Sequence, residues 1–398
     1  MRAYFKFEFI QFMFNKKNIA IYVILLFFAC FYALKMAPSY DPIEQVDREE
    51  IEARFLTRED FLTNLVIDEN TYPLTRFAAA IYPEWNEYDK QRLDAIDNND
   101  LKKYAESTYK WYEYSDFMIF RNGRDLLYYN PRYYTAGNLY ATEDGHYAYM
   151  YSASRFKGYA EGNSDLSMDV FEERTALQTL QRLLHGYLPL ILLVSCILFT
   201  ADIVLKDKRN PTLIKGFPIS IWKRLLVKGG IALIGSFLTV VPLSVGFFII
   251  AIQNGFGDLK LPVPIFSYEA RAFTMISMGE YLFQNTLLIL FWFMLLISLL
   301  LLISITIRNE FANLALGLVV VFAEFYYYVR GLGFVKDIQW YPSSYVQVGQ
   351  IIAGYREYLN NSIELNLTNG LLVMSACTAV CLLITFLISN RRGFKYLR

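Results

Sequence analysis

Histidine is scarce in this sequence, and several signatures of catalysis are missing from it. The only histidines among its 398 residues are His146 and His185, which are far apart in the chain, so a histidine-based zinc site has no support. No Gly-x-x-x-x-Gly-Lys-Ser/Thr phosphate loop occurs, so the sequence offers no cradle for a nucleotide. The apolar segments also lack paired carboxylates and a serine–histidine arrangement. These absences argue against a membrane enzyme and against an ATPase within the chain.

Cysteine is scarce as well, and its positions exclude a disulfide-stabilised domain. All four cysteines fall in predicted membrane spans, and the long polar segment 39–184 contains none. That segment must therefore fold without disulfides. Cys377 and Cys381 are four residues apart on one helical face, where small packing residues are favoured over a metal or redox pair.

Charged residues are absent from six mostly apolar runs of the chain. A membrane helix needs roughly 20 apolar residues. Three of the runs meet this length, the first is short, and the second needs residues 203–205 as well. The fifth spans a bilayer only if Glu324 and the tyrosines after it lie within or near the bilayer edge. A soluble protein would need six buried helices free of charge on every face, so the sequence predicts an integral membrane protein with six spans. The six runs are 18–34, 186–201, 229–257, 281–307, 311–323 and 365–390.

The distribution of lysine and arginine predicts the orientation of these spans. With the N-terminus inside the cell, the inner segments carry 16 basic and four acidic residues. Segment 39–184 carries 27 acidic and 16 basic residues, a net charge of −11. Because basic residues are retained on the cytoplasmic side, both termini are predicted to be cytoplasmic and segment 39–184 extracellular. The inner segments are then 1–17, 202–228, 308–310 and 391–398.

The first apolar run is predicted to be a retained anchor. Lys16 and Lys17 give it the basic flank of a signal peptide, but the run exceeds the usual length of about 7–15 residues, and residues 34–38 form a poor cleavage site. The preceding residues 4–14 are rich in aromatic side chains. This composition favours a helix lying in the inner membrane interface over a simple extension of the first span.

The sequence thus predicts an all-α polytopic protein of the plasma membrane. Six transmembrane helices are joined to an N-terminal interfacial helix and to a large extracellular domain, mainly α-helical or α+β. Asp100 is expected to cap a helix of that domain. The predicted segments are an interfacial helix 1–17, first span 18–37, extracellular domain 38–184, second span 186–205, cytoplasmic loop with coupling helix 206–228, third span 229–253, outer loop 254–280, fourth span 281–307, fifth span 311–329, outer loop 330–368, sixth span 369–390 and cytoplasmic tail 391–398.

Eight tyrosines are close together in the predicted extracellular domain. They fit either an aromatic surface that binds a peptide, lipid headgroup or glycan, or a mixture of core and interface residues. The mixture is favoured, because closeness in sequence does not place side chains on one surface. The residues are Tyr128, Tyr129, Tyr133, Tyr134, Tyr140, Tyr147, Tyr149 and Tyr151.

The cytoplasmic loop 202–228 has the pattern of a short helix beginning near Pro218. The helix would have an apolar stripe beside three basic residues, Lys223, Arg224 and Lys228. The stripe consists of Ile219, Trp222, Leu225 and Leu226. Such a helix could lie under the membrane and offer a face to a cytoplasmic partner. The alternative is a basic loop that only fixes topology, and the pattern does not separate the two.

The order of motifs in this loop resembles that of ABC-2 type transporter permeases, the membrane subunits of one class of ATP-driven exporter. Members commonly have a charged end to the second span, a threonine-leucine turn, a proline-isoleucine-serine run and a lysine entering the third span. A polar break at 307–312 and the layout of one span, a large outer domain and five spans also resemble one branch of this family. Members often have a glutamate leading into the loop, where this chain has Asp202 or Asp207. The residues that match the loop motifs are Thr212, Leu213, Pro218, Ile219, Ser220 and Lys228.

The resemblance implies that this chain is a transport subunit, itself neither an enzyme nor a cofactor-binding protein. A coupling helix within 210–226 would dock in a cleft of a separate cytoplasmic ABC ATP-binding subunit, which binds the ATP. A second copy or a homologous permease would complete a bacterial exporter in the lipid bilayer, without nucleic acid as a partner. Relatives carry peptides, bacteriocins, lipids and drugs. The residues expected to contact the ATPase are Pro218, Ile219, Ser220, Trp222, Lys223 and Arg224.

A membrane receptor or sensor is the alternative function. Its extracellular domain would bind a ligand, and its spans would signal to a partner. The six spans argue against this role, because a receptor needs one or two.

Two residues within predicted spans are candidates for the translocation path or the dimer seam. Glu324 is the one clear carboxylate inside a span, and burying it costs several kcal/mol unless it is paired or wetted. It could instead lie at the outer interface, since Tyr326 and Arg330 belong to a possible interfacial belt. Pro242 would kink the third span or leave a carbonyl free.

Overall fold

Long apolar runs fold as helices here because a backbone in lipid must satisfy its own hydrogen bonds. Among the residues that the computed structural model describes, five helices are long and apolar enough to cross a membrane. A further apolar helix, α14 (Glu310–Phe322), has only 13 residues. The chain is therefore a mainly helical protein with the character of a multi-pass membrane protein. The five candidate spans are Lys16–Met36, Leu188–Asp207, Ile221–Asn254, Met278–Thr306 and Leu367–Asn390.

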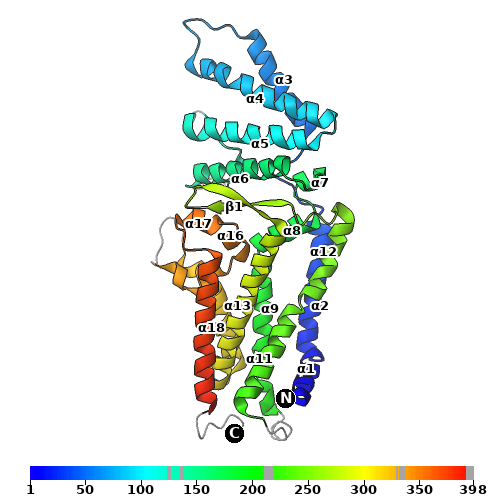
Figure 1. Ribbon diagram of the computed structural model, residues 1–398, viewed down its shortest axis with the longest axis vertical. Coiled ribbons are helices and arrows are strands. Elements are labelled where there is room, and N and C mark those ends of the chain that lie inside the picture. Colours follow the sequence, from blue (N-terminus) through cyan, green and yellow to red (C-terminus); the bar gives the residue numbers. More distant parts are fainter. Residues whose placement is uncertain (123–126, 135–138, 210–218, 329, 331–336, 391–398) are drawn as a thin grey trace.

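The molecule is elongated, with the apolar helices in a bundle and a stack of polar helices beyond one end of it (Figure 1). We call the stack, residues 48–185, the head. The opposite end of the bundle, where α1 lies and α18 ends, is the base (Figure 1). The structure describes residues 1–122, 127–134, 139–209, 219–328, 330 and 337–390.

The helices of the bundle alternate in direction along the chain (Figure 1). α9 and α13 form its centre, because 67% and 72% of their apolar windows are buried. The α2, α11–α12 and α18 spans are peripheral, with 17–28% buried, and present apolar side chains to their surroundings. The elements are α1 (Arg2–Met13), α2 (Lys16–Phe31), η1 (Tyr32–Met36), α9 (Leu188–Thr200), η4 (Leu205–Arg209), α11 (Ile221–Phe237), α12 (Val240–Asn254), α13 (Met278–Thr306), α14, α15 (Glu324–Tyr327) and α18 (Leu367–Asn390).

The head is a ladder of helices that lie across the long axis of the molecule. Away from the bundle, α6 is followed by α5 and then by α4 with α3, while α8 lies at the top of the bundle itself (Figure 1). Asp47 and Asp100 cap α3 and α5 by accepting hydrogen bonds from backbone amides of the first turn, as predicted for Asp100. Tyr104, Phe156 and Phe171 are fully buried between the layers. The elements are α3 (Arg48–Asn64), α4 (Pro73–Asp97), α5 (Leu101–Phe117), η2 (Met118–Asn122), η3 (Pro131–Tyr133), α6 (Ala141–Glu161), α7 (Met168–Phe171) and α8 (Ala176–His185).

The clustered tyrosines do not form one surface. Tyr129 and Tyr149 are buried in the head and stack edge-on, with ring centroids 4.9 Å apart, whereas Tyr128 is 78% exposed. Tyr147 and Tyr151 lie on the face of α6 that contacts the bundle side, where both pack against Phe273. The structure therefore agrees with the interpretation as a mixture of core and interface residues.

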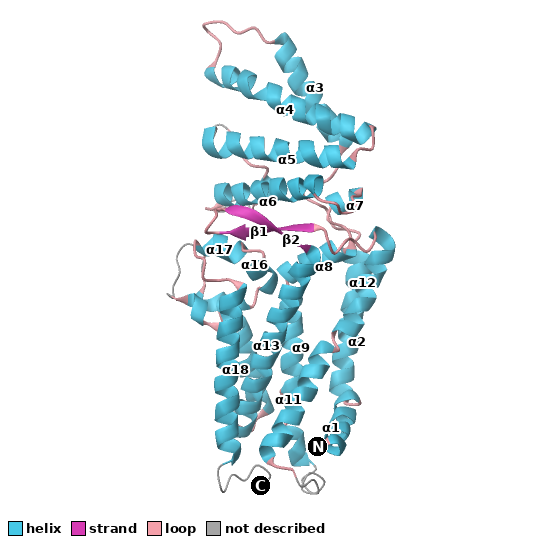
Figure 2. Ribbon diagram, in the orientation of Figure 1, coloured by secondary structure: helices cyan, strands magenta, loops and turns pink. Residues whose placement is uncertain are grey.

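A two-stranded antiparallel sheet, β1 (Pro262–Ser267) and β2 (Ala272–Ser277), separates the head from the bundle (Figure 2). It lies within the segment predicted only as an outer loop. Tyr147 of α6 packs against Phe266 of the sheet and against Tyr358, with ring centroids 5.9 and 4.7 Å apart. Sequence-distant segments thus meet at this junction. The short elements beside it are η5 (Ile338–Trp340), η6 (Pro342–Tyr345), α16 (Val348–Ile352) and α17 (Tyr355–Asn360).

Candidate functional site

A buried ion cluster joins three elements at the base of the bundle. Lys228 of α11 is 1% exposed, and its Nζ lies 2.8 Å from Glu8 Oε1 and 2.9 Å from Asp207 Oδ1. The same ammonium donates to the carbonyl oxygen of Ile203 at 2.9 Å. The ammonium is therefore paired with two carboxylates and hydrogen-bonded to one carbonyl, as burial of a charged group requires. We call Glu8, Asp207 and Lys228 the base triad.

Two further buried groups surround the base triad. Arg224 is 9% exposed and lies one helical turn before Lys228. Together with the base triad it gives two positive and two negative side chains, whose formal charges sum to zero. Tyr4 is fully buried on α1, one turn before Glu8. Burial, reinforced by the Glu8 carboxylate, raises the pKa of the Tyr4 phenol far above its ordinary value. The phenol therefore stays neutral and adds no charge to the cluster.

A second ion cluster ties α2 to the end of α9. The Lys17 ammonium lies 2.5 Å from Asp202 Oδ1 and also donates to the carbonyl of Leu198. Lys206 approaches the other oxygen of Asp202 at 3.2 Å. Both aspartates that the sequence offers for the position of the family's glutamate are thus used in ion pairs at the base.

The N-terminal helix α1 packs against the bundle through one face. Its buried residues Tyr4, Glu8 and Phe12 are spaced four apart, and Phe5 and Ile10 are exposed. The Phe12 ring lies over Gly235 of α11, where a Cβ atom would come within 2.2 Å of it. α1 ends at Met13 and α2 begins at Lys16, so the predicted N-terminal helix is a separate element in the structure.

The residues predicted to contact an ATPase have different environments. Pro218 lies outside the described residues. Ile219 is half-buried, and Ser220 is exposed just before α11. Trp222 packs edge-on against Phe386 of α18, at 5.3 Å between ring centroids. Lys223 is exposed, whereas Arg224 is buried beside the base triad. Residues 221–228 are the first turns of the apolar helix α11, and no separate short helix precedes it between 219 and 221. The coupling role of these six residues remains a prediction.

Glu324 lies at the end of the bundle nearest the head. It is 5% exposed, and its Oε1 lies 2.9 Å from Arg356 Nη1 of α17. The Arg356 guanidinium also lies over the Tyr328 ring, 5.3 Å from its centroid. The carboxylate is therefore paired, as the cost of burial demands, and it fastens α15 to α17.

Pro242 follows an interruption of the third apolar run. α11 ends at Phe237, and α12 begins at Val240, so Pro242 is in the first turn of α12. There its missing N–H leaves no intrahelical hydrogen bond unmade. The proline thus accompanies a break that precedes it by a few residues.

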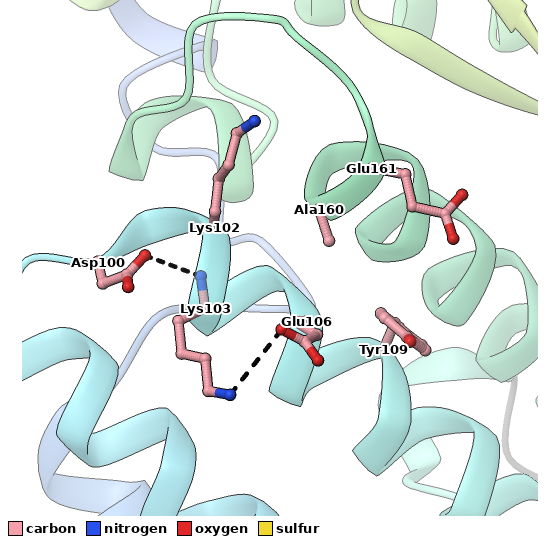
Figure 3. A pocket seen from close by; sticks show the side chains of 7 residues that line it. All are labelled: Asp100, Lys102, Lys103, Glu106, Tyr109, Ala160 and Glu161. Carbon is pink, nitrogen blue, oxygen red and sulfur yellow. Dashed lines mark hydrogen bonds and ion pairs between the residues drawn. The ribbon is translucent and has the colours of Figure 1, made fainter.

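An open hollow on the side of the head is a weaker candidate for a site. It lies between the start of α5 and the end of α6 and is lined mainly by charged side chains (Figure 3). Asp100 is used in capping the Lys103 amide at 3.0 Å, and Glu106 pairs with Lys110 at 2.6 Å. Two of the hollow's carboxylates thus already have partners within the head. Within the described parts of the chain, no group of three or more His, Cys, Asp or Glu side chains could hold a metal ion.

His185, at the end of α8, makes the stability of the head–bundle junction sensitive to acid. Its ring stacks on Tyr281 at 6.1 Å, and burial lowers its pKa to about 4, below the value of roughly 6.5 expected for an unfolded chain. The unfolded state therefore binds more protons between these pH values, so stability falls as the pH drops from 6.5 towards 4. We expect a loss of about 1.5 kcal/mol between pH 6.5 and 5.

Thermal or chemical unfolding of the detergent-solubilised protein at several pH values measures this effect. His185→Gln, which cannot take up the proton, should flatten the slope between pH 6.5 and 5 relative to the parent protein. Equal slopes in the two proteins would show that His185 does not cause the acid sensitivity.

Parts of the base site could be predicted from the sequence, but their association could not. Lys228 matches a motif of the ABC-2 type permeases, and Asp207 was predicted for an acidic position, but Glu8 had no predicted role. One signal was available: Glu8 is the single acidic residue of α1, and Lys228 is the last charged residue of α11, where the apolar part of that helix begins. A charge in such a place needs a partner of opposite sign, but the sequence does not show which residue that partner is.

Comparison with known proteins gave no match: no family model, no curated protein and no solved structure is significantly similar to this chain.

Proposed function

We propose that this chain is the membrane-spanning permease subunit of an ATP-driven exporter of the ABC-2 type. It would move a peptide, lipid or drug outward, with energy from a separate cytoplasmic ATP-binding subunit. A second copy or a homologous permease would form the other half of the exporter. The observation that carries the proposal is the base triad. It holds both ends of the loop between Asp207 and Lys228, whose sequence resembles the corresponding loop of ABC-2 type permeases.

The base triad supports a mechanical role for this end of the bundle. It joins α1, the segment after α9 and the start of α11 through one buried ammonium. The loop between Asp207 and Lys228 is therefore anchored at both ends. A push on this loop would be passed to α9 at the centre of the bundle and to α11 together. A loop that only fixed topology would need no such buried anchor.

The proposed topology has six spans, with the base in the cytoplasm and the head outside the cell. The alternating direction of the helices supports it, because α14 and α15 together provide a fifth passage between α13 and α18 (Figure 1). The positive charge of the segments at the base supports the orientation. Both termini would then be cytoplasmic.

The start of α11 offers exposed residues for the ATPase. Ser220 and Lys223 are exposed, and Leu226, three residues further along the same face, is 43% exposed. We expect Lys223→Glu combined with Leu226→Asp to weaken binding of the ATP-binding subunit at least tenfold, which is about 1.4 kcal/mol. Binding of the purified ATPase to the permease in nanodiscs, measured by interferometry, provides the test.

A matched pair of substitutions far from the base serves as control. Leu259 and Lys260, beside the sheet, are also exposed. Leu259→Asp with Lys260→Glu makes the same chemical change and should leave the affinity within twofold of the parent. If both double variants bind the ATPase like the parent, the contact assigned to α11 is wrong.

A receptor or sensor remains the second candidate, favoured by the close packing of the head on the sheet that joins α12 to α13. A ligand bound to the head could act on the bundle through this contact. Ligand binding without ATP-dependent transport in reconstituted vesicles would favour the receptor, whereas transport that requires ATP would favour the permease.

A further inference from the structure

The layer of the head farthest from the bundle carries most of the head's negative charge. Residues 47–100, which include α3 and α4, contain 14 acidic and six basic residues, a net charge of −8. The remainder of segment 39–184 contains 13 acidic and ten basic residues, a net of −3. Several cations of the layer are already paired: Arg48 lies 2.8 Å from Asp97, and Arg58 lies 2.6 Å from Asp89. The charge available to a partner is therefore strongly acidic.

The same layer exposes apolar side chains at its tip, where α3 connects to α4. The only fully buried residue of α3 is Ile51, so this helix contributes little to a core. Exposed apolar side chains that lie close together commonly mark a surface that another molecule covers. We call the following residues the apolar tip: Val66 (83% exposed), Ile67 (56%), Tyr72 (70%) and Leu74 (44%).

We propose that the apolar tip and its acidic surroundings form a docking surface for a cationic amphipathic polypeptide. The charge selects this occupant among the molecules that cover apolar surface. A second copy of the head would bring its own net charge of −8 against this one, and like charges placed together are destabilising. An anionic lipid surface is disfavoured for the same reason. A polypeptide with one apolar and one basic face satisfies both features of the layer.

This surface is independent of the base triad. The tip lies at the end of the molecule opposite α1 (Figure 1). The proposal therefore goes beyond the transport role and holds whether or not an ATPase binds at the base.

The test measures binding of model peptides to the full chain in nanodiscs of zwitterionic lipid, with empty discs as the blank. A fluorescent amphipathic peptide of leucine and lysine should bind saturably, and more weakly as salt is raised. A leucine and glutamate peptide of the same length should not bind. Val66→Ser combined with Ile67→Ser should weaken binding of the leucine and lysine peptide at least tenfold, and so should Glu59→Lys combined with Glu69→Lys.

Glu113→Lys with Glu161→Lys makes the same change of charge at exposed positions of α5 and α6 and should leave the affinity within twofold of the parent. The proposal would be overturned if the leucine and lysine peptide bound with equal affinity to the parent, to the Val66→Ser and Ile67→Ser variant and to the Glu59→Lys and Glu69→Lys variant. Equal binding of the leucine and glutamate peptide would also overturn it, and so would self-association of the parent that the Val66→Ser and Ile67→Ser substitutions abolish. Circular dichroism of each variant confirms that its helices are intact.

Discussion

Replacing Lys228 with Met is expected to destabilise the protein by about 3 to 5 kcal/mol, the range found when one partner of a buried ion pair is removed. Met preserves most of the length of the side chain, so the loss is mainly that of the charge. Glu8 and Asp207, which are 4% and 3% exposed, would remain buried without their cation. The Glu8 carboxylate could reach water only if α1 moved away from α11. Unfolding of the detergent-solubilised protein, followed by intrinsic fluorescence, measures the change.

Neutralising one partner provides the control for Lys228. Glu8→Gln added to Lys228→Met leaves Asp207 balanced by Arg224, so it should recover much of the lost stability, because no net charge is then buried. Lys260→Met, at an exposed position, should change stability by less than about 0.5 kcal/mol. If Lys228→Met alone unfolds like the parent, the base triad does not hold the three elements together.

Replacing Gly354 with Ala is expected to destabilise the junction between the head and the bundle by about 2 to 4 kcal/mol. Gly354 has a φ of +70°, in the left-handed region, and its added Cβ would lie 2.0 Å from the carbonyl oxygen of Phe266. The obstruction is backbone of β1, which cannot rotate away as a side chain could. The Phe266 amide also donates to the Ala353 carbonyl at 3.0 Å, so the two segments are fastened at this point.

Gly255 separates the two causes of this loss. It has a φ of +83°, but nothing lies within 4 Å of the position of its Cβ. Gly255 has a ψ of 158°, so Gly255→Ala should cost about 1 to 3 kcal/mol for the backbone conformation alone. Hydrogen exchange of β1 and α17 should accelerate in Gly354→Ala and not in Gly255→Ala. Unchanged exchange of β1 and α17 in Gly354→Ala would mean that the close approach to Phe266 does not constrain the junction.

The long apolar helices could be predicted from the sequence, because they depend on local composition alone. The ends of these helices were harder to predict near the base, where the chain turns. The run that was predicted to begin its span at residue 229 continues an apolar helix from Ile221. Lys223, Arg224 and Lys228 suggested a loop, but two of them are buried in charge-balanced contacts. A charged residue in a sequence therefore indicates exposure to solvent only when no oppositely charged residue lies beside it in the fold.

The β-sheet at the junction could not be predicted from its own residues. β1 contains Pro262 and Pro264, which are unfavourable within a sheet of several strands. In a two-stranded sheet one edge of each strand is free, so a missing amide is tolerated on that edge. The aromatic contacts that stabilise the sheet come from Tyr147 and Tyr358, far away in the chain. Only the tertiary structure brings these residues together.

The candidate site shows the same limit. Each member of the base triad was visible as a charge in an unusual place, but Glu8 and Lys228 are separated by the whole head and two long helices. Local patterns carry no information on such a pair. The division of the predicted coupling residues into exposed Lys223 and buried Arg224 likewise follows from how α11 packs, which hydrophobic pattern alone leaves open.

Affinity purification of the tagged full-length chain from its native membrane, in mild detergent and with crosslinking, tests the central claim most directly. The proposed permease role predicts an ATP-binding cassette protein in near-equal amount with the chain. It also predicts that the Lys223→Glu and Leu226→Asp variant recovers much less of that protein, while the Leu259→Asp and Lys260→Glu variant recovers as much as the parent. Recovery of the folded chain with no ATP-binding protein would contradict the proposed function.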